Sequence, residues 1–258
     1  MSNIRKAFEN GKAFIAFITC GDPDLETTAA AVRAAEKNGA DLIELGIPFS
    51  DPTAEGVVIQ EANIRSLSSG MTTDGVFEIV KRVREQSEIP LAFMTYVNPV
   101  FHYGYEKFFT KCEELGISAI IIPDVPYEEK TEVEAPAKAH GVKVISMIAP
   151  TSESRIRQIA SEAEGFIYVV SSMGVTGVRS EIKTDLPAIV ESIRTVTDVP
   201  CAIGFGISTP EQAKAMASIS DGAIVGSAIV KIIAKYGKDA APYIGEYVKS
   251  MKEAVAEA

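Results

Sequence analysis

The chain has 258 residues, of which 47% are hydrophobic and 23% are charged, and this composition excludes a disordered or low-complexity protein. Its 25 lysines and arginines and 35 aspartates and glutamates give a formal net charge of −10. Because such a surface repels a phosphate backbone, nucleic acid is not expected as a partner. No apolar run is long enough to cross a bilayer and the first residues do not form a signal-peptide pattern, so we expect a cytoplasmic protein that does not bind a membrane.

Cysteines and histidines narrow the chemistry further. The three cysteines form no C-x-x-C pair, and their odd number indicates free thiols in a reducing compartment. The two histidines, His102 and His140, are too few and too far apart for a zinc site or a two-histidine iron site. We therefore expect no bound metal.

Short apolar runs, each bounded by turn residues, recur along the whole chain. Near-continuous apolar runs of this length are typical of parallel strands that are covered on both faces. In chain order, the predicted strands are residues 14–19, 42–45, 91–95, 119–122, 142–147, 166–170, 202–204 and 223–225.

Between the strands, apolar residues recur at the helical period. In the first such segment Leu25, Ala29 and Val32 lie on one helical face, and Gly39 follows as a stop signal. The predicted helices are residues 25–38, 73–87, 105–115, 128–140, 152–163, 186–197, 210–217 and 229–236, with additional helices over 2–10 and 240–258.

Eight strand–helix units of about 32 residues each predict an α/β fold, a (β/α)8 TIM barrel with extra N- and C-terminal helices. No linker-like stretch divides the chain, so we expect a single domain over residues 1–258. An open, doubly wound parallel sheet is the alternative. The longest connections without a predicted helix, 46–59 and 171–183, both follow strands and would lie at the C-terminal mouth of a barrel, where barrel enzymes place their active sites.

Glu44 is the first candidate for catalysis, because it interrupts an apolar strand. Alternation places Leu42 and Glu44 on one face of that strand, with Ile43 and Leu45 on the other. If the second pair faces the helices, Glu44 points into the barrel, where burial raises the pKa of a carboxyl group and suits it to general acid/base chemistry. The alternative is a structural glutamate that is hydrogen-bonded to the neighbouring backbone.

Two further carboxylates, Asp51 and Glu55, lie on the long loop after that strand, and the sequence favours a catalytic role for them no more than a solvated surface. Glycines follow the last three predicted strands, in the segments 174–177, 204–206 and 226–227. Because glycine lets backbone N–H groups approach an anion and a helix N-terminus adds a favourable dipole, these segments predict a phosphate site. The alternative for each is a tight turn without a ligand.

Aromatic and sulfur side chains near the strand ends, those of Phe17, Met94, Tyr96 and Tyr168, could line a slot for an aromatic ligand or simply fill the barrel. An imine-forming aldolase needs a lysine at the C-terminal end of a strand, whereas Lys143 begins its strand. A lyase on this scaffold would therefore work through carboxylate acid/base chemistry.

Five segments in chain order resemble the tryptophan synthase alpha subunit family, and the resemblance covers essentially the whole chain. They are residues 17–23 (FITCGDP), 44–52 (ELGIPFSDP), 123–126 (PDVP), 171–177 (SSMGVTG) and 204–208 (GFGIS). The family cleaves indole-3-glycerol phosphate to indole and glyceraldehyde 3-phosphate, a retro-aldol reaction, and this resemblance implies the same carbon–carbon lyase activity here.

The resemblance also assigns roles to the candidate residues. Glu44 corresponds to the catalytic carboxylate, which protonates indole C3 and then takes the proton of the glycerol hydroxyl group. Glu55 corresponds to the second carboxylate, beside the indole N–H, although the family usually has an aspartate there. Tyr168 corresponds to a catalytic-site tyrosine beside Glu44. Phe17, Met94 and Tyr96 are expected in the indole pocket.

For the phosphate and for the partner, the resemblance implies a further set of residues. The phosphate contacts correspond to Gly177, Gly206, Gly226 and Ser227. Family members bind a pyridoxal-phosphate beta subunit as an α2β2 heterotetramer and pass indole to it for L-tryptophan synthesis, so no cofactor is expected in this chain. Asp51 and Thr176 are expected on mobile loops near the beta subunit.

Two other functions remain open at this stage. The chain could be a weakly catalytic subunit that acts mainly as an allosteric activator of the beta chain, which the change to Glu55 encourages. It could also be another phosphate-binding barrel isomerase, which would share the glycine segments but not the segment 44–52.

Overall fold

Every predicted strand forms in the computed structural model, which describes residues 4–171 and 185–258. The strands are β1 (Ala13–Thr19), β2 (Leu42–Gly46), β3 (Leu91–Met94), β4 (Ala119–Ile121), β5 (Lys143–Val144), β6 (Ser146–Ile148), β7 (Ile167–Val170), β8 (Cys201–Gly204) and β9 (Gly222–Val225). They pair in parallel in the order β5-β4-β3-β2-β1-β9-β8-β7-β6.

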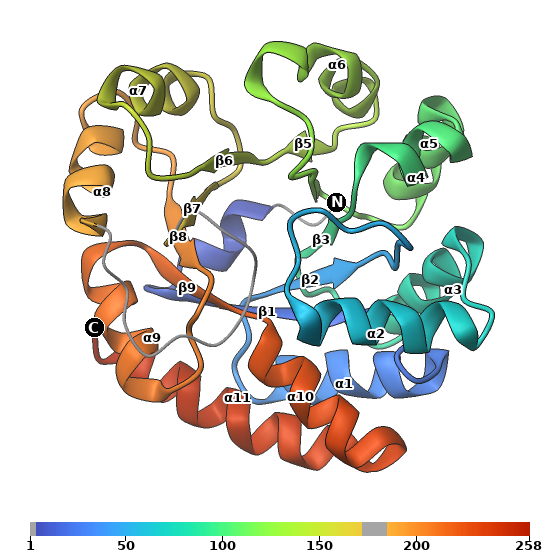
Figure 1. Ribbon diagram of the computed structural model, residues 1–258. Coiled ribbons are helices and arrows are strands. Elements are labelled where there is room, and N and C mark those ends of the chain that lie inside the picture. The colour runs from blue at the N-terminus through green and yellow to red at the C-terminus, as the bar shows by residue number, and fades with distance from the viewer. Residues whose placement is uncertain (1–3, 172–184) are drawn as a thin grey trace.

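The strands β5 and β6, at the two ends of this order, are one predicted strand that is interrupted at Ile145. β5 pairs with β4, and β6 pairs with β7, while the Ile145 N–H donates a hydrogen bond to the Ile120 carbonyl at 2.9 Å. The continuous segment 143–148 therefore joins the two edges of the sheet, and Figure 1 shows the resulting barrel inside a ring of helices. The TIM barrel prediction is confirmed, and the open doubly wound sheet is wrong.

The surrounding helices agree with the predicted ones, with two additions. The α-helices are α1 (Leu25–Lys37), α2 (Val57–Ser68), α3 (Thr73–Arg84), α4 (Val97–Tyr103), α5 (Tyr105–Glu114), α6 (Thr131–Ala139), α7 (Glu153–Ser161), α8 (Leu186–Arg194), α9 (Pro210–Ile219), α10 (Ser227–Tyr236) and α11 (Ala240–Ala256). The sequence prediction missed α2 and α4. It also expected a helix at the N-terminus, where the structure has the short 3-10 turn η1 (Ile4–Phe8).

The helix α2 escaped prediction because its pattern lacks a clean apolar stripe. Val57 is 66% exposed and Ile64 is 63% exposed, while Asn63 and Ser66 are buried. Hydrophobic periodicity, which locates surface helices, is weak when apolar residues face outward and polar residues face inward. Within the described residues, no helix is long and apolar enough to cross a membrane.

Alternation along the strands separates two apolar regions. Ile15 and Leu42 lie inside the barrel with other inward-facing side chains, whereas Ile43 and Leu45 pack between the barrel and the helices. This arrangement confirms the predicted orientation of β2 and leaves Glu44 pointing into the barrel.

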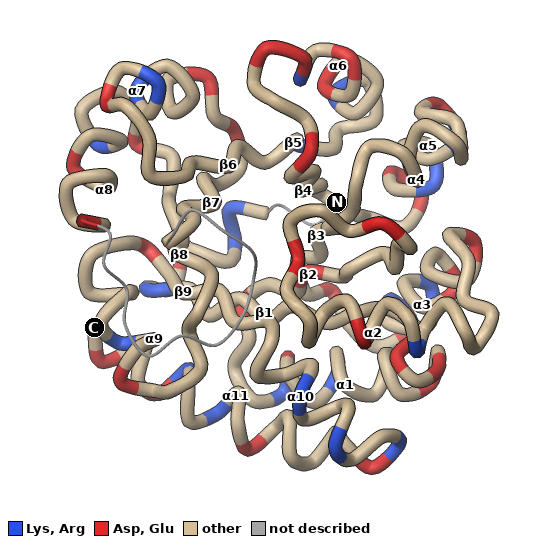
Figure 2. The backbone as a smooth tube through the Cα atoms, in the orientation of Figure 1, with Lys and Arg blue, Asp and Glu red and all other residues tan. Residues whose placement is uncertain are grey.

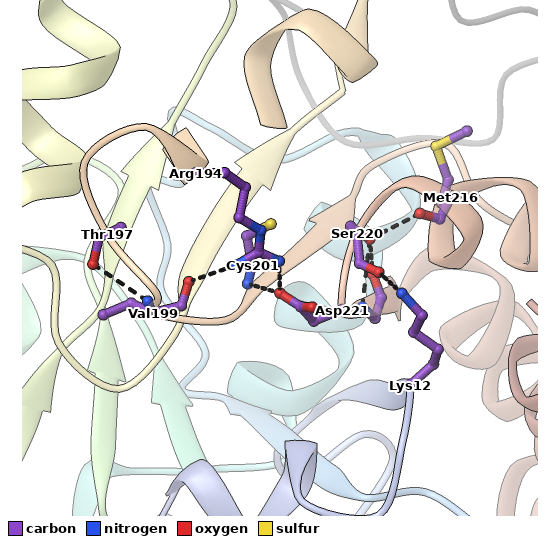
Figure 3. A network of polar contacts seen from close by, with 9 residues as sticks. Lys12, Arg194, Thr197, Val199, Cys201, Met216, Ser220 and Asp221 are labelled. Carbon is purple, nitrogen blue, oxygen red and sulfur yellow. Dashed lines mark hydrogen bonds and ion pairs between the residues drawn. The ribbon is translucent and has the colours of Figure 1, made fainter. Parts of the chain in front are cut away.

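A polar network at the foot of the barrel joins the N-terminal ends of β8 and β9 (Figure 3). Asp221 Oδ2 accepts a hydrogen bond from the Cys201 N–H at 2.8 Å and a second one from the Arg194 guanidinium group. Lys12 donates to the Ser220 carbonyl. These contacts tie the starts of β8 and β9 to α8 and to the segment before β1, at the end of the barrel where structural contacts predominate.

We expect Asp221→Ala to lower the free energy of unfolding by about 1–3 kcal/mol, because the Cys201 N–H loses its acceptor. Urea denaturation at neutral pH measures this loss. Asp198→Ala is the matched control, because Asp198 and Asp221 line one surface depression beside the network but Asp198 accepts no such hydrogen bond from the described residues. Equal unfolding midpoints for the two variants would contradict the role of Asp221.

Candidate active site

The barrel opens at the C-terminal ends of its strands into a hollow that encloses about 500 Å³, the space at its mouth included. Side chains from β1, β2, β3, β7, β9, α2 and the turn after β8 contribute to its walls. The described lining consists of Phe17, Glu44, Glu55, Ile59, Met94, Tyr168, Phe205, Gly206, Ile207, Ile224, Gly226 and Ser227. The hollow thus combines two carboxyl groups with an otherwise largely apolar wall.

Glu44 lies near the end of β2, between Phe17 on β1 and Ala92 on β3. Its side chain is fully buried, and neither carboxyl oxygen has a hydrogen-bond partner among the described residues. Burial raises the pKa of Glu44 to about 8, so this group is mostly protonated at neutral pH. The absence of a described partner argues against the structural alternative and leaves both oxygens free for a ligand.

Glu55 reaches the same hollow from the loop between β2 and α2. Its carboxyl group is buried and accepts a hydrogen bond from Asn63 Nδ2 at 2.7 Å, while Gln60 Nε2 donates to the Glu55 backbone carbonyl at 2.7 Å. Burial raises the pKa of Glu55 to about 7, and the hydrogen bond from Asn63 opposes that rise. Glu55 is therefore the more acidic of the two groups, and its burial argues against the solvated surface position that the sequence left open as an alternative.

Two glycines make room for the aromatic walls of the hollow. A Cβ atom added to Gly46 would lie 2.6 Å from Phe17 Cζ, and one added to Gly204 would lie 2.7 Å from Tyr168 Cζ. The Tyr168 ring also meets the Phe205 ring edge-on, with centroids 5.9 Å apart. The glycines at these strand ends thus allow the rings of Phe17 and Tyr168 to pack directly against the neighbouring backbone inside the barrel.

We expect Gly204→Ala to lower the free energy of unfolding by about 1–3 kcal/mol, because the new methyl group overlaps the Tyr168 ring. Thermal unfolding of the variant measures the effect. Adding Tyr168→Phe removes the hydroxyl oxygen, the closest atom to the new methyl group, and should recover part of the loss. A variant as stable as the parent would show that the two residues are not in contact.

The far end of the hollow is suited to an anion. Gly226 is the N-cap of α10 and Ser227 is its first residue, and both line the hollow. The N-terminus of this helix, whose first N–H groups have no acceptor within the helix, therefore borders the hollow. Gly206, in the turn after β8, has a φ of +81° that favours glycine. No lysine or arginine is among the described lining residues, and Figure 2 shows lysine and arginine positions along surrounding helices such as α10 and α11.

The structure brings most of the predicted site residues together, but Tyr96 and Asp51 lie apart from the hollow. Tyr96 is buried behind the loop that carries Glu55, where its hydroxyl oxygen accepts a hydrogen bond from the Ala54 N–H at 3.0 Å and its ring packs against Phe49. Asp51 is exposed on the same loop. Tyr96 therefore stabilises this loop through its contacts with Ala54 and Phe49.

Two predicted site residues cannot be placed, and several residues at the site were not predicted. Thr176 and Gly177 lie outside the described residues. Five further residues of the site or its surroundings were not predicted from the sequence: Ile59, Phe205, Ile207, Ile224 and Asn63. Ile59 and Asn63 were missed because they lie on the unpredicted helix α2. In the described residues, no group of three or more histidine, cysteine or acidic side chains could hold a metal ion.

Comparison with known proteins identifies the family. A sequence model of the family described as "Tryptophan synthase alpha chain" matches residues 3–256. The chain belongs to the tryptophan synthase alpha chain family. The alpha chain of Lacticaseibacillus casei is 49% identical over 255 residues, which are 99% of this chain and 96% of the relative. The alpha chain of Lactiplantibacillus plantarum is 47% identical over 256 residues, with coverages of 99% and 97%.

Solved structures of the tryptophan synthase family have the same fold. The alpha chain from Legionella pneumophila superposes with a TM-score of 0.88 at 35% identity and covers 99% of this chain and 97% of its own. A chain from the tryptophan synthase α2β2 complex of Pyrococcus furiosus superposes with a TM-score of 0.85 at 33% identity, with coverages of 93% and 98%. The family assignment thus rests on sequence and on fold.

Proposed function

We propose that this chain cleaves indole-3-glycerol phosphate to indole and glyceraldehyde 3-phosphate, as a carbon–carbon lyase that forms one catalytic domain over residues 1–258. The observation that carries the proposal is Glu44, a fully buried carboxyl group without a described hydrogen-bond partner, which lines a hollow together with a second carboxyl group and the N-terminus of α10. Membership of the tryptophan synthase alpha chain family supports the same reaction.

The proposed reaction needs one acid and one base, and Glu44 serves as both. In its protonated form it gives a proton to indole C3, and the resulting carboxylate accepts the proton of the glycerol hydroxyl group next to the scissile bond. The carbon–carbon bond then breaks, its electron pair returns to the indole ring, and the hydroxyl carbon becomes the aldehyde. Glu44 ends protonated, as it began, and a pKa of about 8 favours this starting state at neutral pH.

Protonation of C3 places positive charge on the indole ring, and Glu55 is the group that we assign to stabilise it. Its carboxylate would accept a hydrogen bond from the indole N–H, where the charge accumulates. Burial raises the pKa of Glu44 further than that of Glu55, so Glu55 is the first of the two to ionise as the pH rises. Two carboxyl groups in one hollow thus take different roles because their surroundings separate their pKa values.

The remaining lining residues are assigned to the two ends of the substrate. Phe17, Met94 and Tyr168 offer an apolar slot for the indole ring, with Tyr168 beside Glu44. For the phosphate we propose the N–H groups of Gly206, Gly226 and Ser227, which the hollow exposes near the N-terminus of α10, together with the N–H group of Gly177.

We further propose that indole passes to a beta subunit in an α2β2 heterotetramer, the assembly that the tryptophan synthase of Pyrococcus furiosus forms. The loops with Asp51 and Thr176 are the proposed contacts. The cleavage itself needs only proton transfers, so the proposal requires no cofactor in this chain, and pyridoxal phosphate is assigned to the beta subunit.

A product assay tests the proposed function. The purified chain is incubated with indole-3-glycerol phosphate, with and without a tryptophan synthase beta subunit, and indole and glyceraldehyde 3-phosphate are quantified separately. We expect equal amounts of the two products from the chain alone and faster release with the beta subunit. If neither sample cleaves the substrate but the chain accelerates tryptophan formation from added indole and serine, the chain is an activator and the proposed lyase function is wrong.

A further inference from the structure

Asn63 contacts the second carboxyl group from α2. Its side chain is buried, with 4% of its surface exposed, and its Nδ2 donates to Glu55 Oε2 at 2.7 Å. An ionised carboxylate can only accept hydrogen bonds, so the NH2 group of the Asn63 amide is the group that faces it. This contact occupies Oε2 and leaves Oε1 of Glu55 for the hollow.

We propose that Asn63 is a positioning residue for Glu55, which fixes the glutamate side chain so that its free oxygen meets the ring of the bound substrate. The inference rests on the proposed lyase function and adds a residue to it. Asn63 does not line the hollow and therefore acts only through Glu55.

A long side chain such as that of glutamate needs a fixed anchor. Gln60 holds only the backbone carbonyl of Glu55, so rotation about the side-chain bonds is limited by burial and by the hydrogen bond from Asn63. Displacement of a catalytic group by about 1 Å can lower the rate on the order of 10²-fold. The amide of Asn63 can therefore have a large effect on the rate of cleavage without contacting the substrate.

The anchor is itself held in place by the contacts of α2. Arg65 donates to both carboxylate oxygens of the buried Asp22, at 2.8 and 2.7 Å, and Ser66 Oγ donates to the Cys20 carbonyl at 2.6 Å. These contacts join α2 to the loop that follows β1. Through these contacts α2, and with it Asn63, is tied to the barrel as well as to the loop that carries Glu55.

The hydrogen bond also affects the charge of Glu55. Burial raises the pKa of this group, and the bond from Asn63 favours the ionised form and opposes the rise. The other titratable groups near it are Tyr96, behind the loop, and Glu44, in the wall of the hollow. Burial raises the pKa of both, so both are mostly neutral at pH 7. Loss of the Asn63 donor should therefore raise the pKa of Glu55.

The test uses Asn63→Leu and Asn63→Asp, two variants close in size to the parent, in the full chain. We expect the acid limb of kcat/KM against pH to move up toward the alkaline limb, so that the bell narrows, and kcat to fall by about 10- to 100-fold. Carbon-13 NMR of the Glu55 carboxyl group, which needs no substrate, should show the same upward shift. Glu61→Gln is the control, because Glu61 is an exposed residue of α2 and should leave both limbs unchanged.

A double-mutant cycle separates positioning from general stability. In a Glu55→Gln background, Asn63→Leu should cause no further loss of kcat, because the group that Asn63 positions is already absent. An unmoved acid limb and carboxyl resonance, or equal losses in both backgrounds, would overturn the proposal. If the parent chain releases no indole, the lyase function fails, but the NMR titration still decides whether Asn63 governs the ionisation of Glu55.

Discussion

Glu44→Gln should lower the rate of indole release by about 10³-fold or more, while indole-3-glycerol phosphate still binds. The amide has nearly the shape of the protonated acid, but it neither gives a proton to indole C3 nor accepts one from the glycerol hydroxyl group. General acid/base catalysis contributes typically ~10²–10⁴-fold, and one residue performs both transfers here. Single-turnover kinetics measures the cleavage step, and equilibrium binding of the substrate to the variant measures affinity.

The same variant supplies its own control for folding. Burial raises the pKa of Glu44 from 4.5 to about 8, so between these values the unfolded chain releases the proton and the folded chain keeps it. The parent therefore loses stability as pH rises through this window, a loss that the glutamine variant does not share. We expect the stability advantage of Glu44→Gln to grow on the order of 3 kcal/mol between pH 5 and pH 8. Retention of most turnover in the glutamine variant would refute the catalytic role of Glu44. A stability advantage of Glu44→Gln that does not change with pH would show that Glu44 is not held as a neutral acid.

A second large effect is expected at Glu55, where Asp and Asn form a matched pair of nearly identical shape. Glu55→Asp keeps the charge and should retain at least about a tenth of the parent kcat/KM, whereas Glu55→Asn removes it and should lose about 10²–10³-fold. Both shorten the side chain by one methylene group, so the difference between them measures the charge alone. Steady-state kinetics with both variants makes the comparison.

The pH profile gives an independent reading of the same residue. The parent should show a bell-shaped kcat/KM, with an acid limb near pH 7 from Glu55 and an alkaline limb near pH 8 from Glu44, as apparent values of the pair. Glu55→Asn should lose the acid limb and keep the alkaline one. An asparagine variant as fast as the parent at every pH would show that Glu55 is not the second carboxylate.

The parts of this molecule that follow local rules were predictable from the sequence. The strands appear as apolar runs, and alternation along β2 correctly placed Glu44 inside the barrel, because a side-chain period of two leaves no other orientation once Ile43 and Leu45 face the helices. The interruption of the fifth strand at Ile145 was not predictable, because each side of the break begins with one polar residue followed by apolar ones and no glycine or proline marks it.

The environment of the second carboxylate was not predictable, because it depends on tertiary contacts. The helix α2 carries exposed apolar residues and buried polar ones, so the hydrophobic pattern did not predict this helix. The hydrogen bond between Asn63 and Glu55 could not be predicted for the same reason. Tyr96 illustrates the converse case. A strand end rich in aromatic residues indicated a pocket wall, but whether a ring faces the pocket or the loop behind it depends on how that loop packs.

The turn after β8 has a consequence for the rigidity of the pocket. Phe205 has a φ of +76°, the one such value among the non-glycine residues that the structure describes, and this conformation costs a bulky residue about 1–2 kcal/mol. Glycine would relieve the backbone, yet it would remove the ring that packs edge-on against Tyr168 and closes one wall. The backbone strain at Phe205 is therefore coupled to the shape of the cavity. A stabilising glycine at this position should make the wall of the site less rigid while it makes the chain easier to fold.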